Sequence, residues 1–89
     1  MFADAAKLKV LGERIARVRQ TYGANIDLPN LEPNLFAALL GVSSITYESH
    51  ERGETEPTVD FLIAMRKKTG VSLDWLLDPD QSTPDRTFR

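Results

Sequence analysis

The residues that could do covalent or metal chemistry in this chain are few. His50 is the only histidine and there is no cysteine, so neither a thiolate metal site nor a cluster of imidazole ligands can form. The sequence also has no glycine-rich phosphate loop, no HExxH-like pair and no Ser/His/Asp set in which His50 has two partners. We therefore expect a protein that is not an enzyme and that uses no cofactor or metal.

Hydroxyl-bearing side chains are instead concentrated in one short segment, which holds Ser43, Ser44, Thr46 and Ser49. Ser43 is a favourable N-cap and Gly53 a favourable stop, so the residues between them predict a short helix over 44–51. Serine can donate or accept a hydrogen bond, so such a helix can bind a polar partner but discriminates weakly between partners.

A second predicted helix, over residues 31–40, comes directly before this segment. Pro33 is acceptable there because the first turn of a helix needs no backbone donors. Gly41 can adopt the left-handed conformation that ends a helix, so the two helices are joined by a very short turn. The apolar residues that we expect to face the core from this helix are Phe36, Leu39 and Leu40.

Three further helices must position this pair. In the first, apolar residues recur at spacings of three and four between an N-cap at Asp4 and a stop at Gly23; they are Leu8, Leu11, Ile15, Val18 and Tyr22. Thr58 caps a helix that runs to Gly70, and Ser72 caps a short one over 73–77. The predicted fold class is all-α, with five helices and a helix-turn-helix formed by the second and third.

The chain has 89 residues, which is enough for one hydrophobic core. We expect one domain over residues 1–78, followed by a polar, proline-containing tail over 79–89 that is flexible. No apolar run is long enough to span a membrane, and the first residues do not resemble a targeting signal. We therefore expect a cytoplasmic protein without membrane contact.

The net charge of −2 is unevenly distributed. Residues 1–24 carry five basic and two acidic side chains, whereas residues 25–65 carry seven acidic side chains and Arg52 as their one cation. Any basic surface must therefore come mostly from the first helix and from the run Arg66, Lys67 and Lys68 near the end of the fourth.

Four sequence blocks, in order, carry a family resemblance: GERIARVR (12–19), FAALLGVS (36–43), ERGETEP (51–57) and GVSLDWLL (70–77). On these blocks the chain resembles the phage repressor and Cro family, also called the XRE type, over roughly residues 11–78. The resemblance implies a five-helix lambda-repressor-like domain whose third helix enters the major groove of double-stranded DNA, usually as a homodimer on two half-sites.

The resemblance also implies which residues meet DNA. The family's base-contacting positions fall on Ser44, Ile45 and Ser49, with Thr46 and Glu48 beside them, and its phosphate contact from the second helix falls on Pro33. We add Ser43 and Arg52 to this set. The family often has glutamine or arginine at the base-contacting positions, and proline has no backbone N–H to offer a phosphate.

The role of Ile45 allows two interpretations, a DNA contact or a different role. They arise because the family normally exposes a polar residue at this position. The Ile45 side chain can pack against thymine methyl groups, or it can contact a protein partner or lie on the rim of the core. Glu54 and Glu56 follow in a loop that in many relatives carries basic residues, and here they predict a solvated loop rather than a phosphate contact.

Four other residues are given structural roles. Arg19 and Glu51 look like the family's ion pair between the first and third helices, which would orient the recognition helix. His50 is expected at the rim of the core, and Trp75 is expected to plug the core or a dimer seam. The segment 24–30 is expected to fold Ile26 or Leu28 onto the domain.

Two functions remain at this point. The first is a DNA-binding transcriptional regulator that binds a palindromic operator as a dimer. The alternative is a protein-interaction module, antitoxin-like or an adaptor, that keeps the helix-turn-helix scaffold, and the scarcity of basic residues around the third helix favours it.

Overall fold

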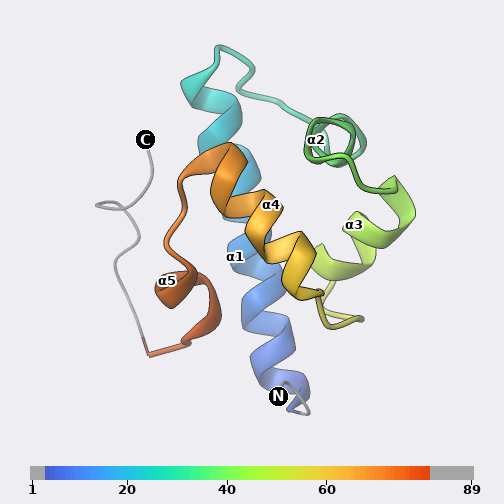
Figure 1. Ribbon diagram of the computed structural model, residues 1–89, viewed down its shortest axis with the longest axis vertical. Helices are drawn as coiled ribbons and strands as arrows, with labels where there is room; N and C mark the ends of the chain where they lie inside the picture. The colour runs from blue at the N-terminus through green and yellow to red at the C-terminus, as the bar shows by residue number, and fades with distance from the viewer. Residues whose placement is uncertain (1–3, 81–89) are drawn as a thin grey trace.

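The computed structural model describes residues 4–80, which form five helices and no strand (Figure 1). The helices are α1 (Ala5–Asn25), α2 (Pro33–Leu40), α3 (Ser44–Glu51), α4 (Val59–Thr69) and α5 (Leu73–Leu77). The prediction of an all-α fold is confirmed. Pro79 and Asp80, at the start of the predicted tail, are exposed, and residues 81–89 lie outside the described residues.

Four of these helices begin where a polar side chain accepts a hydrogen bond from the backbone of the first turn. The caps are Asp4, Ser43, Thr58 and Ser72, as the sequence predicts. The exception is α2, which starts two residues later than predicted, because Pro33 is its first residue and Glu32 makes no side-chain cap. Gly41 ends α2 with a φ of 80°, a conformation that residues with a Cβ adopt only with strain.

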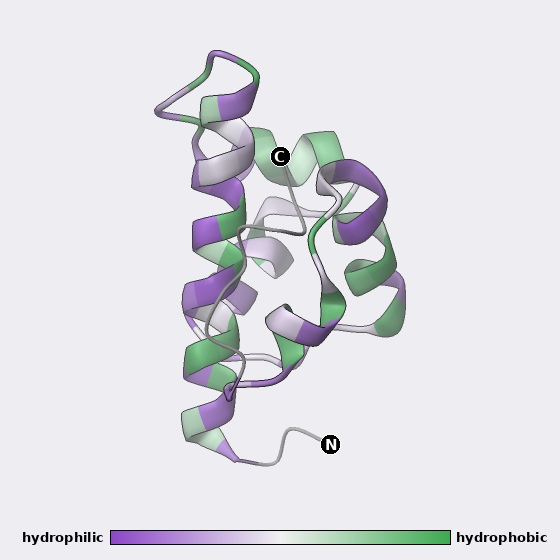
Figure 2. Ribbon diagram, turned by 90° about the vertical axis from the view of Figure 1, so that its left-hand side faces the viewer, coloured by the Kyte–Doolittle hydropathy of each residue, from purple (hydrophilic) through white to green (hydrophobic). Residues whose placement is uncertain are grey.

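The longest helix, α1, runs the length of the molecule, and the other helices pack along one side of it (Figure 2). The shared core is made of apolar side chains that are at most 4% exposed. A chain of aromatic contacts crosses it from α1 to α4, with ring centroids 5.6–6.1 Å apart, through Tyr22, Phe36, Tyr47 and Phe61. Trp75 is buried against the same core, as predicted.

The backbone of α1 passes unusually close to the end of α3. A Cβ added at Gly12 would lie 2.5 Å from the carbonyl oxygen of Glu51 and 2.7 Å from that of His50. Only a residue without a side chain allows this approach, so Gly12 fixes the distance between α1 and α3.

The prediction that Gly23 ends the first helix is wrong. Gly23 is buried inside α1, and its carbonyl accepts a hydrogen bond of 2.7 Å from the backbone N–H of Leu28. A Cβ at this position would lie 2.4 Å from the carbonyl oxygen of Leu28. The glycine is therefore needed for the returning chain to lie against the helix, and not to stop it.

The prediction that Ile26 or Leu28 folds onto the domain is also wrong. Both are more than two-fifths exposed, and Leu31 is the buried residue of this segment. The backbone of the loop returns along α1 and passes close to Gly23 at Leu28. The side chain of Leu31, rather than that of Leu28, therefore fills the space beside α1. Leu39 was expected in the core and is instead exposed, whereas Phe36 is fully buried and Leu40 packs partly against the core.

Candidate nucleic-acid interface

The side of α3 that faces away from the core carries the residues predicted to meet DNA. Tyr47 and His50 point inward and are buried, while Ile45 is 80% exposed. The other members of the predicted set range from partly exposed to exposed; they are Ser43, Ser44, Thr46, Glu48, Ser49 and Arg52. Ile45 does not lie at the core rim, so that interpretation is excluded, and Pro33 lies partly buried in the first turn of α2.

The inward side of α3 is anchored by a largely buried ion pair. Arg19 Nε donates to Glu51 Oε2 at 2.7 Å and Arg19 Nη2 donates to Oε1 at 3.3 Å, with both side chains at most 15% exposed. The hydroxyl of Tyr47 donates to the same carboxylate. Arg19 Nη1 donates to the carbonyl of Leu31 at 2.6 Å. One guanidinium thus joins α1, α3 and the α1–α2 loop, as predicted for an orienting pair.

The charges in this cluster are stabilised by one another. Burial disfavours the charged form of Arg19, but the hydrogen bonds that Arg19 donates to Glu51 and the negative charge of that carboxylate together outweigh burial and raise the pKa of the guanidinium. Burial and the neighbouring Glu51 carboxylate raise the pKa of Tyr47, so its phenol stays protonated and donates. Arg19 therefore stays charged and Tyr47 stays neutral in the physiological range.

A hydrogen-bonded chain connects the outer and inner sides of α3. Ser49 Oγ lies 2.5 Å from Thr55 Oγ1, and Thr55 Oγ1 lies 2.8 Å from Nδ1 of His50. His50 is 5% exposed, and its ring packs edge-on against Phe61 with the ring centroids 4.8 Å apart. His50 was expected at the rim of the core and is instead buried in it, and sequence reasoning missed Thr55. A buried histidine needs a hydrogen-bonding partner, so the expected position of His50 against the core could have led to a search for a polar residue such as Thr55 close to it in the sequence.

The cation that follows α3, Arg52 at its C-cap, is already paired within the chain. Arg52 Nε lies 3.0 Å from Glu54 Oε2, and both side chains are more than half exposed. The hydrogen bond to Arg52 lowers the pKa of Glu54, with a further contribution from the charge of Lys9. Lys9, Arg52 and Glu54 line one shallow hollow, so α1 supplies a second cation beside α3. Glu56 is exposed in the same loop.

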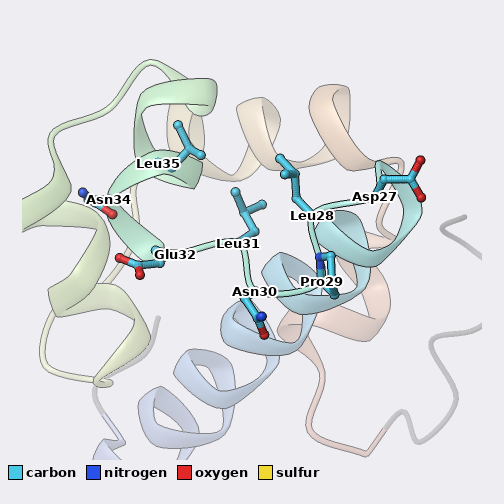
Figure 3. A pocket seen from close by; sticks show the side chains of 8 residues that line it. All are labelled: Asp27, Leu28, Pro29, Asn30, Leu31, Glu32, Asn34 and Leu35. Atoms are coloured by element: carbon cyan, nitrogen blue, oxygen red, sulfur yellow. The ribbon is translucent and has the colours of Figure 1, made fainter.

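A different kind of surface lies between the α1–α2 loop and the first turn of α2. It is a hollow of about 490 Å³, in which Leu28 and Leu35 point the same way on either side of Leu31 (Figure 3). Leu28 and Leu35 are 43% and 48% exposed, and Leu31 forms the buried part between them. Two carboxylates, Asp27 and Glu32, lie at its edges.

Comparison with known families places this arrangement in a class. A family model described as helix-turn-helix, of the XRE type, matches residues 30–76. This match contains α2, the turn at Gly41, α3, α4 and most of α5. No curated protein and no solved structure matches the chain.

The chain therefore belongs to the XRE-type helix-turn-helix family, and it is a DNA-binding helix-turn-helix regulator. Families of this type are typically not enzymes. Among residues 4–80, no helix combines the length and the apolar character that a membrane span requires.

Proposed function

We propose that this protein is a regulator of the phage-repressor type that binds a palindromic operator as a homodimer. The observation that supports this proposal is the pairing of an exposed, mostly polar face on α3 with a rigid anchor behind it. A recognition helix must hold its side chains in one orientation to distinguish bases, and the Arg19–Glu51 pair restricts α3 in that way.

In this proposal the outward residues of α3 divide into two roles. Ser44, Ile45 and Ser49 face the bases, where Ile45 packs against thymine methyl groups. Arg52 neutralises a phosphate when it exchanges its contact with Glu54 for one with the duplex, and Lys9 adds a second cation next to it. Ser43, Thr46 and Glu48 flank these contacts.

A salt titration tests the proposal. Binding to a selected duplex and to a scrambled one is followed by fluorescence anisotropy as the salt concentration rises. Each neutralised phosphate contributes about 0.9 to the slope of log affinity against log salt, and we expect a slope for roughly two to five contacts per dimer. If no duplex is selected and no binding occurs at low salt, the proposal is wrong.

Two variants separate the proposed roles. Arg52→Ala removes one phosphate contact from each subunit of the homodimer, so it should weaken binding to both duplexes and reduce the slope by about 1.8. Ile45→Ala should weaken binding to the selected duplex and leave binding to the scrambled duplex unchanged. Lys68→Ala is the matched control, because this exposed cation lies in the last turn of α4, near Tyr22 and Leu39 and away from α3. It should change neither affinity.

One observation favours the alternative, a protein-interaction module. The hollow beside α2 exposes two leucines that would gain from burial, since a fully buried leucine is stabilised by roughly 1.5–3 kcal/mol relative to an exposed one. A second copy of this chain is the occupant that this candidate names, and self-association without DNA binding distinguishes the candidate from the homodimeric DNA-binding regulator. Sedimentation of the wild-type chain and of Leu28→Ser/Leu35→Ser without DNA tests it, because only a dimer built on the hollow should fall to the monomer mass.

A further inference from the structure

The single proton of the Ser49 hydroxyl already has acceptors within the protein. Ser49 Oγ donates to the carbonyl oxygen of Thr46 at 3.0 Å and lies 2.5 Å from Thr55 Oγ1. A serine hydroxyl has one proton and two lone pairs, so it can satisfy at most one acceptor. Whether Ser49 can donate a hydrogen bond to a ligand or only accept one therefore depends on the positions of the protons along the Ser49–Thr55–His50 series of hydrogen bonds.

The buried ring of His50 allows two arrangements. Burial lowers its pKa, so the ring is neutral at pH 7 and only one of its nitrogens carries a proton. If that nitrogen is Nδ1, His50 donates to the hydroxyl or the carbonyl oxygen of Thr55, the Thr55 hydroxyl donates to Ser49, and Ser49 donates to the carbonyl of Thr46.

If the proton is instead on Nε2, Thr55 donates to Nδ1, and the short contact requires Ser49 to donate to Thr55. Both arrangements use the Ser49 proton inside the protein. Both leave Ser49 at least one lone pair for a group outside it.

We propose that Ser49 reads DNA as a hydrogen-bond acceptor only, and thereby selects adenine or cytosine over guanine or thymine at the base it faces. In the major groove, N6 of adenine and N4 of cytosine are donors, whereas O6 of guanine and O4 of thymine are acceptors. An oxygen without a free proton binds the first pair and is repelled by the second. This inference rests on the proposed DNA-binding function and adds a base preference to it.

Thr55 is a positioning residue in this scheme. It touches no base itself, but its hydroxyl fixes where the Ser49 oxygen lies and where the Ser49 proton goes. Thr55→Ser keeps the hydroxyl and should keep the preference. Thr55→Val removes one of the two internal acceptors and frees Ser49 to rotate, so the preference should weaken.

The test compares base preferences and not affinity alone. Binding sites are selected from one randomised duplex library with the wild-type chain and with Ser49→Ala. We expect one base pair at which the wild-type chain shows a preference of about threefold to tenfold, the range for one net hydrogen bond. The favoured pair should place adenine or cytosine on the strand that Ser49 faces. Ser49→Ala should lose that preference and keep the preferences at all other positions.

A single-atom change in the DNA sharpens the test. In the adenine version of the site, 2-aminopurine pairs with thymine but has no amino group in the major groove. The wild-type chain should lose the same threefold to tenfold on this duplex, and Ser49→Ala should lose nothing.

An unchanged wild-type affinity for the 2-aminopurine duplex would overturn the inference, because Ser49 would then accept no hydrogen bond from the amino group of adenine. Identical preferences in both chains would overturn it too, because Ser49 would then face no base. A wild-type chain that binds no duplex would contradict the proposed function itself, and this outcome is distinct because no base preference could be measured.

Discussion

The outer face of α3 and the hollow beside α2 are both exposed surfaces, but they are built in different ways. The α3 face carries one exposed apolar residue, Ile45, among polar ones, and a buried ion pair and hydrogen bonds hold it from behind. The hollow groups two exposed leucines, and the segment that forms it is held mainly by backbone contacts around Gly23. The first surface suits directional hydrogen bonding to bases, and the second suits apolar packing.

The largest effect should come from removing the anchor of α3. Glu51→Ala leaves the Arg19 cation and the Tyr47 hydroxyl without their acceptor in a mostly buried site, and we expect a loss of about 3 kcal/mol in the free energy of unfolding. Urea denaturation measures this loss. Glu54→Ala removes the carboxylate of an exposed pair and should leave stability unchanged. A loss below about half a kcal/mol for Glu51→Ala would mean that the pair does not anchor the helix.

The second effect tests the backbone contact that shapes the hollow. In Gly23→Ala the new Cβ meets the carbonyl of Leu28, so the loop must move away from α1, and we expect a loss of about 2 kcal/mol. Amide chemical shifts should change from Leu28 to Leu35 and stay constant in α3. Ala24→Ser, at an exposed neighbouring position, serves as the control. A stable variant with unchanged shifts would show that this contact does not hold the loop.

The third effect concerns the pH dependence of the Ser49–Thr55–His50 chain. Burial lowers the pKa of His50 below its ordinary value of 6.5, partly opposed by the hydrogen bond that His50 Nδ1 donates to the carbonyl oxygen of Thr55. Below pH 6.5 the unfolded chain therefore binds a proton that the folded chain does not, so stability falls as the pH is lowered from 6.5 toward the folded pKa. Stability is restored above pH 6.5, where both forms are neutral.

Unfolding measured between pH 5 and pH 7.5 checks this prediction. His50→Gln cannot titrate and should remove this part of the pH dependence, whatever it does to stability at pH 7.5. If the wild-type protein and His50→Gln show the same pH dependence of stability, that dependence comes from groups other than His50.

The smallest effect should show whether a carboxylate next to α3 and one at the edge of the hollow affect DNA affinity differently. Glu54→Gln releases Arg52 from its internal pair, so affinity for any duplex should rise by roughly a factor of two to five. The salt slope should stay the same, because Arg52 already neutralises a phosphate in the wild-type complex. Glu32→Gln makes the same change in charge at the edge of the hollow and should not alter either quantity. Equal effects of the two variants would mean that only net charge matters.

Much of the fold could be predicted because the signals are local. Ser43, Thr58 and Ser72 cap their helices as expected, and Gly41 makes the turn, since capping and left-handed conformation depend on neighbouring residues alone. The position of α3 followed from the same signals, whereas its outward residues were assigned through the family resemblance. The Arg19–Glu51 pair was recognised only through the family resemblance, because the two residues lie 32 positions apart.

The amino-acid sequence by itself determined the five helices, the turn between α2 and α3 and the helix-turn-helix class, because each rests on short-range patterns. Only the tertiary structure decided that Gly23 lies inside α1, that Leu31 replaces Leu28 in the core, and that Thr55 joins Ser49 to His50. These outcomes depend on which backbone segments approach one another. Close packing fixes such distances to within an ångström, and a one-dimensional pattern does not contain them.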